Sequence, residues 1–113
     1  MAEEAQAEEV NAPQLWPWLV VEQIYGSLPT QADGQIMGFP FYFRSRHGAW
    51  GLWVSKPDVD PCSIDNDEAV YFAEGKDDYN GCMPNEEVFR LLAHHCMIMK
   101  DREDKLKEIR KLA

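Results

Sequence analysis

The feature that most constrains this chain is a pair of aromatic, strand-forming segments joined by only two residues. Residues 39 to 46 and residues 49 to 55 are rich in Phe, Tyr, Trp and Val, and His47-Gly48 lies between them. Aromatic and β-branched residues favour strands. A two-residue hairpin turn needs positive φ, which Gly accepts freely and His tolerates better than most residues. The sequence therefore predicts an antiparallel hairpin that reverses direction at His47-Gly48.

A reversal at this point fixes the register of the two strands. The expected cross-strand pairs are Arg46 with Ala49, Ser45 with Trp50, Arg44 with Gly51, Phe43 with Leu52, Tyr42 with Trp53 and Phe41 with Val54. Successive side chains of a strand point to opposite faces. One face is therefore almost wholly apolar and is expected to be core; it carries Phe39, Phe41, Phe43, Trp50, Leu52 and Val54. The opposite face carries Tyr42, Arg44, Arg46 and Trp53.

Three weaker signals flank the hairpin. Residues 19 to 25 are compatible with either a strand or a short helix, because their β-branched residues favour a strand while Leu19 and Gln23 allow a helix. A loop is predicted after them from four turn-forming residues, Gly26, Pro29, Asp33 and Gly34. Residues 69 to 73 are predicted to form a further short strand with Val70 and Phe72 on one side, and residues 74 to 84 a turn-rich connection.

A long helix is predicted from about residue 85 to residue 111. It follows Pro84 and has acids in its first turn, where the helix dipole favours them. Apolar residues keep helical spacing at Val88, Leu91, Leu92, Met99, Leu106 and Ile109. From residue 100 onward the segment is charged except for Leu106 and Ile109. We expect this half to project from the core, either as a solvated extension or as one member of a helix pair in a homodimer.

Together these elements predict an α+β fold: a small antiparallel sheet of three to four strands with a long C-terminal helix packed on one face. At 113 residues the chain has room for one core and is too short for two ordinary domains. Residues 15 to 113 are therefore expected to form a single domain. Residues 1 to 14 contain four acids and no aromatic residue, a composition that predicts a disordered acidic tail.

Composition also indicates where the protein works. No apolar run approaches the length of a membrane span, so we expect no membrane association. The first ten residues carry four glutamates where a secretory signal needs basic residues and an apolar run, so we expect a cytoplasmic protein. The three cysteines, Cys62, Cys82 and Cys96, are too few and odd in number for a disulfide framework and are predicted to be free thiols.

The net charge of −9 is concentrated in two regions, the first 14 residues and residues 56 to 83. The second region carries eight acids and two bases. A nucleic-acid backbone is bound by clustered cations, so this distribution disfavours wrapping of DNA or RNA by the protein surface as a whole.

No motif in the chain predicts a metal, a cofactor or a catalytic centre. His94, His95 and Cys96, with Cys62 and Cys82, are residue types that bind zinc, but no C-x-x-C or H-x-x-x-H spacing is present. The acids of residues 58 to 68 lack the spacing of a calcium loop, and no glycine-rich phosphate loop opens a helix. No nucleophile has an orienting partner. We therefore expect a binding protein rather than an enzyme.

Two surfaces are candidates for binding. The first is acidic and is expected to contact a basic protein surface, such as that of a nucleic-acid-binding protein; it comprises Asp58, Asp60, Asp65, Asp67, Glu68, Asp77 and Asp78. In this interpretation the chain is an acidic inhibitor or nucleic-acid mimic, and phage-encoded antagonists such as anti-CRISPR proteins are of similar size and charge. The alternative is a small-ligand or single-strand nucleic-acid binder that stacks its ligand on the hairpin residues Tyr42, Arg44, Arg46 and Trp53.

Overall fold

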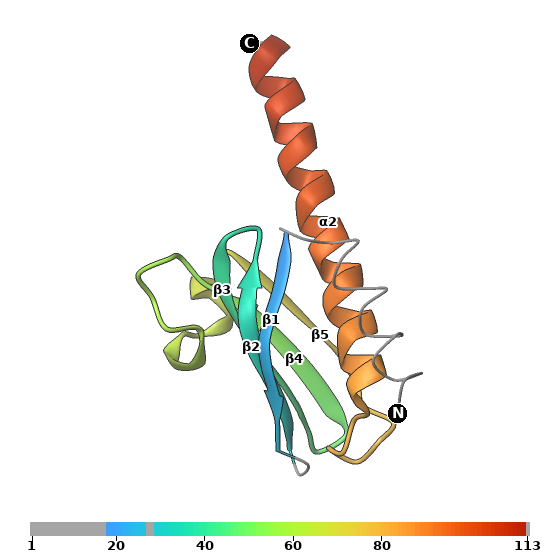
Figure 1. The fold of residues 1–113 in the computed structure, drawn as a ribbon. Helices are drawn as coiled ribbons and strands as arrows, with labels where there is room; N and C mark the ends of the chain where they lie inside the picture. The colour runs from blue at the N-terminus through green and yellow to red at the C-terminus, as the bar shows by residue number, and fades with distance from the viewer. Residues whose placement is uncertain (1–17, 27–28, 113) are drawn as a thin grey trace.

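The computed structural model describes residues 18–26 and 29–112, so the predicted disordered tail of residues 1 to 14 lies outside the described residues. Within that part, one antiparallel sheet with the strand order β1-β2-β3-β4-β5 is followed by one long helix, α2 (Figure 1). The elements are β1 (Leu19–Tyr25), β2 (Thr30–Ile36), β3 (Phe39–Arg46), β4 (Ala49–Val54), two short 3-10 helices η1 (Pro61–Ser63) and η2 (Asn66–Glu68), β5 (Tyr71–Lys76) and α2 (Asn85–Leu112).

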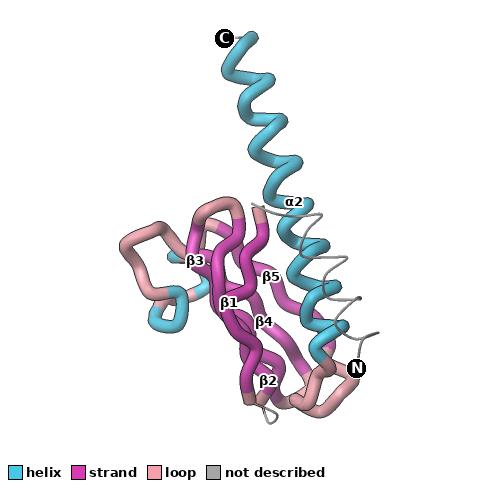
Figure 2. The backbone as a smooth tube through the Cα atoms, in the orientation of Figure 1, coloured by secondary structure: helices cyan, strands magenta, loops and turns pink. Residues whose placement is uncertain are grey.

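The predicted α+β fold with a long C-terminal helix is confirmed, and the sheet has five described strands rather than three to four. Each strand pairs with the strand that follows it in the chain, so the sheet is a simple meander (Figure 2). The segment of residues 19 to 25, which the sequence left open between helix and strand, is strand β1.

In the central hairpin, every cross-strand pair predicted from the sequence is present. His47 and Gly48 both have positive φ, 54° and 77°, as a two-residue turn between twisted strands requires. All six predicted pairs occur, from Arg46 with Ala49 to Phe41 with Val54. The predicted core face is buried at Phe41, Phe43, Trp50, Leu52 and Val54, and Phe39 packs against it as a partly buried side chain.

The loop predicted from Gly26, Pro29, Asp33 and Gly34 is wrong over residues 30 to 36, which form β2. The strand is hard to recognise because its buried face carries small residues; that face comprises Thr30, Ala32, Gly34 and Ile36. Gly34 is required there, since a Cβ at this position would lie 1.9 Å from the carbonyl oxygen of Val20 in β1. The strand then turns into β3 through Met37 and Gly38, again with positive φ at both residues.

The strand predicted over residues 69 to 73 is displaced. Strand β5 begins at Tyr71 and runs to Lys76, whereas Val70 precedes it and is exposed. The turn-rich connection predicted over residues 74 to 84 is wrong over residues 74 to 76, and Gly75 lies within the strand, directly opposite Trp50. A Cβ at Gly75 would lie 2.6 to 2.7 Å from the indole ring atoms of Trp50, so the glycine makes room for that ring.

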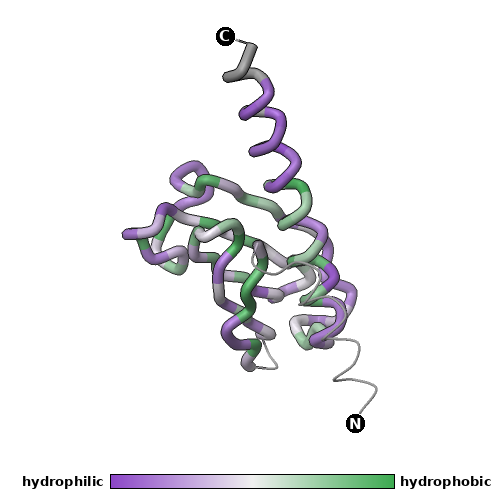
Figure 3. The backbone as a smooth tube through the Cα atoms, turned by 45° about the horizontal axis from the view of Figure 1, so that its top comes forward, coloured by the Kyte–Doolittle hydropathy of each residue, from purple (hydrophilic) through white to green (hydrophobic). Residues whose placement is uncertain are grey.

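Helix α2 covers the inner face of the sheet with the first half of its length. Its buried residues Val88, Leu91, Leu92 and Cys96 join the strand side chains in one hydrophobic core. Among the described residues, no core member comes after Met99. The helix continues beyond the sheet, and the residues that carry a hydropathy colour there are mostly hydrophilic (Figures 1 and 3). The side chains of Leu106 and Ile109 lie outside the described part. No helix in the described ranges is long and apolar enough to span a membrane.

Candidate binding groove on the outer face of the sheet

The face of the sheet opposite helix α2 carries a row of three aromatic rings. Tyr42, Trp53 and Phe72 occupy paired positions on β3, β4 and β5. The centroids of the Tyr42 and Trp53 rings lie 6.0 Å apart, and those of Trp53 and Phe72 lie 5.6 Å apart. Tyr42 donates its hydroxyl hydrogen bond to Oε1 of Gln31 at 2.7 Å. The row therefore forms a continuous, half-buried aromatic floor.

Trp53 lies flat along its own strand because Gly51 has no side chain. A Cβ at Gly51 would lie 2.4 to 3.1 Å from the far end of the Trp53 ring. The guanidinium carbon of Arg44, the residue paired with Gly51, lies 5.9 Å from the Trp53 ring centroid. At that distance a cation is attracted by the electron-rich face of the ring. The two predicted stacking residues Arg44 and Trp53 are thus in contact with each other.

The connection between β4 and β5, residues 55–70, folds back over one end of this outer face. The short helix η1 contacts β3 and β4, and the indole Nε1–H of Trp53 donates a hydrogen bond to Oδ1 of Asn66 at 2.7 Å. The buried Ser55 holds the start of the connection through its hydroxyl, which donates to the carbonyl oxygen of Val59. The loop and helix α2 therefore lie on opposite sides of the sheet (Figure 2).

Two adjoining pockets form between the sheet and this loop. The acidic pocket, of about 450 Å³, is lined among others by Tyr42, Arg44, Trp53, Asp65, Asn66 and Asp67. The basic pocket, of about 240 Å³, is lined among others by Arg44, Arg46, His47, Gly51, Trp53 and Glu74. Arg44, Trp53 and Asn66 belong to both. We call the two together the outer groove, with Trp53 at its centre.

The predicted acidic surface is divided by the structure. Asp58, Asp60, Asp65, Asp67 and Glu68 are all exposed on the connection between β4 and β5. Two of these carboxylates are also used within the loop: Asp60 accepts a hydrogen bond from the backbone N–H of Cys62, and Glu68 accepts one from that of Asp65. Asp65 and Asp67 are the two that line the acidic pocket.

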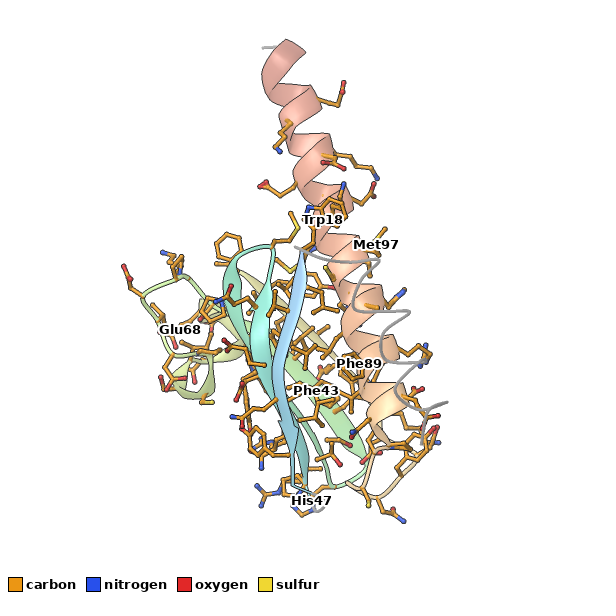
Figure 4. All side chains as sticks on the ribbon, viewed as in Figure 1. Trp18, Phe43, His47, Glu68, Phe89 and Met97 are labelled. Atoms are coloured by element: carbon orange, nitrogen blue, oxygen red, sulfur yellow. The ribbon has the colours of Figure 1, made fainter. Side chains whose placement is uncertain are left out.

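Asp77 and Asp78 lie at the other end of the sheet, because β5 carries the chain back toward the hairpin turn. The N–H of Asp77 donates to the carbonyl oxygen of Gly48. Figure 4 shows the same separation, with Glu68 on the loop beside the sheet and His47 at the opposite end. The sequence analysis grouped the acids of residues 58 to 78 in one surface. In the structure they lie at two separate places and do not form one continuous acidic strip.

Asp77 is not available to a partner at all, since only 4% of it is exposed. Its carboxylate accepts hydrogen bonds from the backbone N–H groups of Tyr79 and Gly81. Burial opposes ionisation, but these bonds and the nearby Ser45 hydroxyl outweigh it and hold the pKa of Asp77 below its ordinary value. The Ser45 hydroxyl itself makes no hydrogen bond of ordinary geometry. Asp77 therefore stabilises the connection to α2, and Asp78 pairs with Lys76 at 3.6 Å.

Two side chains of the acidic pocket that are ordinarily neutral, Cys62 and Tyr42, have raised pKa values. Burial and the neighbouring carboxylate of Asp60 raise the pKa of the Cys62 thiol. Burial also raises the pKa of Tyr42, against the opposing charge of Arg44. A reactive thiol needs a lowered pKa, so Cys62 has the opposite of the environment that activates a nucleophile. What the pocket can supply is aromatic contact, hydrogen bonding and negative charge.

Of the residues whose types can bind zinc, His95 and Cys96 belong to the packing between helix and sheet. Cys96 is fully buried, and burial raises its pKa to about 11. His95 places Nδ1 2.6 Å from the hydroxyl of Tyr71, with its ring 5.4 Å from that of Trp50. Over residues 18–26 and 29–112, no three His, Cys, Asp or Glu side chains are grouped as metal ligands. Cys62 and Cys82 are free and exposed.

Sequence reasoning missed Asn66 and Phe72 as members of the groove. Phe72 had a signal, since strand periodicity places it on the same face as Trp53 once β5 is in register. Asn66 had no such signal in the sequence, because its hydrogen bond to Trp53 depends on how a long connection folds back.

No protein-family model matches the chain, and no curated protein or solved structure is significantly similar to it. Function is therefore inferred from the chemistry of the groove itself.

Proposed function

We propose that this chain is a non-catalytic protein-binding module that receives a basic segment of a partner protein in the outer groove. The observation that supports the proposal is that Asp65 and Asp67 line the same pocket as Tyr42 and Trp53. Two residues of the predicted acidic surface and part of the predicted aromatic face, which the sequence presents as alternatives, thus form two walls of one pocket. A single ligand must satisfy both.

A lysine or arginine side chain satisfies both walls. Its charged end is attracted by the carboxylates, and it also stacks on aromatic faces or packs its aliphatic stem against them. Asp58, Asp60 and Glu68 are exposed on the same loop and add to its negative charge. With a net charge of −9, the chain is expected to attract a basic partner at long range and to bind it faster at low salt. A nucleic-acid-binding protein, which the chain inhibits by covering its basic surface, is the form of partner we favour.

The alternative ligand, a single-strand nucleic acid or another phosphate-bearing molecule, is supported by Arg44 and Arg46 beside Trp53. Aromatic rings and guanidinium groups are typical of such sites. The carboxylates of Asp65 and Asp67 on the adjoining wall oppose it, because they repel phosphate. The two functions therefore predict opposite effects of the same charge reversal.

The proposal is tested with the double variant Asp65→Lys/Asp67→Lys, using Glu108→Lys as a control in which an exposed acid far along α2 is reversed. Partners are captured from a lysate of the encoding organism and identified by mass spectrometry, and their affinities are then measured with purified proteins. We expect the double variant and Trp53→Ala each to weaken binding of the same basic partner roughly tenfold or more. The control should bind like the original chain.

The competing function is measured in parallel with a fluorescein-labelled oligothymidine. Under the proposal the oligonucleotide does not bind the original chain. Binding that is lost in Trp53→Ala and strengthened in Asp65→Lys/Asp67→Lys contradicts the proposal and supports the phosphate ligand. Circular dichroism of each variant establishes that the fold is retained.

A further inference from the structure

The outer groove carries opposite charges on the two sides of Trp53, and neither set is neutralised within the fold. Asp65 and Asp67 lie on one side and Arg46 lies on the other, while Arg44 lines both pockets and lies over the Trp53 ring between them. In the described part of the chain, none of these residues has an oppositely charged group within 4.0 Å. The ion pairs that do form there lie on the helix and at the end of β5.

The basic pocket has a defined shape in addition to its positive charge. Gly51 and Ala49 leave a depression along β4, which is bounded by the Trp53 ring at one end and by the hairpin turn at the other. Arg46 is held at the turn end, where its Nε donates a hydrogen bond to Nε2 of His47 at 2.8 Å. The bond leaves the terminal guanidinium nitrogens free to receive a carboxylate. Among the described residues that line this pocket, one is an acid: Glu74, which is exposed on β5 opposite Gly51.

We infer that the outer groove selects a dipolar segment of its protein partner: a basic side chain enters the acidic pocket while an acidic group of the same segment pairs with Arg46 and Arg44. This inference rests on the proposed function and adds to it a second, acidic determinant. The segment crosses the ring of Trp53 in an extended conformation. A partner that is only basic leaves the two arginines unpaired and loses this contribution.

The strand register fixes how far the two arginines lie from Trp53 along the sheet. Trp53 and Tyr42 form one cross-strand row, Gly51 and Arg44 the next, and Ala49 and Arg46 the one after that. Residues two apart on a strand are separated by about 7 Å, so the arginines lie roughly 7 to 13 Å from the row of Trp53 along β3. An extended partner segment spans this distance with about two to four residues.

The inference is tested by selecting a displayed library of random peptides on the full chain. We expect enriched peptides to contain a Lys or Arg and an Asp or Glu separated by two to four positions. Enrichment of basic residues without an acidic one overturns the dipolar groove and leaves the proposed function intact. Enrichment of acidic residues alone, or no enrichment over the Asp65→Lys/Asp67→Lys variant, overturns both.

A thermodynamic cycle then assigns the acidic determinant to its partner residue. An enriched peptide and its Glu→Gln or Asp→Asn version are titrated against the original chain and against Arg46→Gln. Loss of the peptide's acid should weaken binding to the original chain roughly twofold to fivefold, the range for an exposed ion pair, and should have little effect on Arg46→Gln. Lys105→Gln, which removes an exposed cation of the helix, should behave like the original chain. Equal losses on all three proteins overturn the assignment.

Discussion

The two tryptophans of β4 show how a single missing side chain positions an aromatic ring. Trp53 on the outer face lies over Gly51, and Trp50 on the inner face lies over Gly75. The geometry is similar at both sites, but the surroundings differ. Trp53 borders open pockets, whereas Trp50 is 8% exposed and packs against Phe43 and His95. A ring beside a pocket has room to move, and a ring in the core does not.

We therefore predict opposite consequences for two equivalent substitutions. Gly51→Ala should displace the Trp53 ring, break its bond to Asn66 and weaken partner binding, while lowering the free energy of unfolding by about 1 kcal/mol or less. Gly75→Ala should lower the free energy of unfolding by about 1 to 3 kcal/mol, because the displaced Trp50 overpacks the core. Urea unfolding measures the stabilities, and the NMR shift of the Trp53 indole N–H reports the ring position. Equal destabilisation by both variants would contradict this account.

At the scale of elements, helix α2 and strand β5 meet at a polar contact between His95 and Tyr71. Burial, and secondarily the neighbouring His94, lowers the pKa of His95 below its ordinary value. The hydroxyl of Tyr71 contacts the ring at 2.6 Å, and the guanidinium of Arg102 lies 5.1 Å from the Tyr71 ring centroid. Because burial is the main cause of the lowered pKa, a positive charge on His95 is unfavourable in the folded chain.

Acidification should therefore loosen the packing of helix on sheet. The pKa of His95 is lower in the folded chain than in the unfolded chain. As the pH falls, the unfolded chain therefore takes up the proton at a higher pH than the folded chain does. Stability is complete above the ordinary pKa of 6.5 and declines as the pH falls from there toward the folded pKa. His95→Gln should remove this contribution to the slope of the free energy of unfolding against pH. Urea unfolding between neutral pH and mildly acidic pH measures it, and an unchanged slope in the variant would show that another group is responsible.

The elements also show which parts of the fold and site sequence alone can predict. The β3–β4 hairpin was predictable pair by pair, because His47-Gly48 fixes the register and large side chains mark the core face. Strand β2 was missed, because three of its core-facing residues, Thr30, Ala32 and Gly34, are small and carry no hydrophobic pattern. The groove was predictable only as separate halves. No local sequence pattern predicts that the connection after β4 folds back far enough for Asn66 to accept the hydrogen bond of Trp53.

At the scale of the whole molecule, the sheet separates two tasks. Its inner face and the first half of α2 form the hydrophobic core, and its outer face with the β4–β5 connection forms the groove. Among the described side chains, those of the helix beyond Met99 belong to neither. Beyond Arg102 its described side chains are mostly exposed, and it carries ion pairs within the helix, Lys100 with Asp104 and Asp101 with Lys105. This end is the part of the molecule that the predicted homodimer would use.

Removal of residues 103 to 113 tests that role. If the end is a solvated extension, the shortened chain keeps Arg102 above the ring of Tyr71 and loses only helical ion pairs, each of which contributes about 0.3 to 0.5 kcal/mol. We expect its free energy of unfolding to fall by no more than about 1 kcal/mol, with unchanged binding of a basic peptide. Light scattering should give the mass of one chain before and after truncation. A full-length dimer that becomes a monomer on truncation would instead assign this end to self-association, because dimerisation makes stability depend on protein concentration.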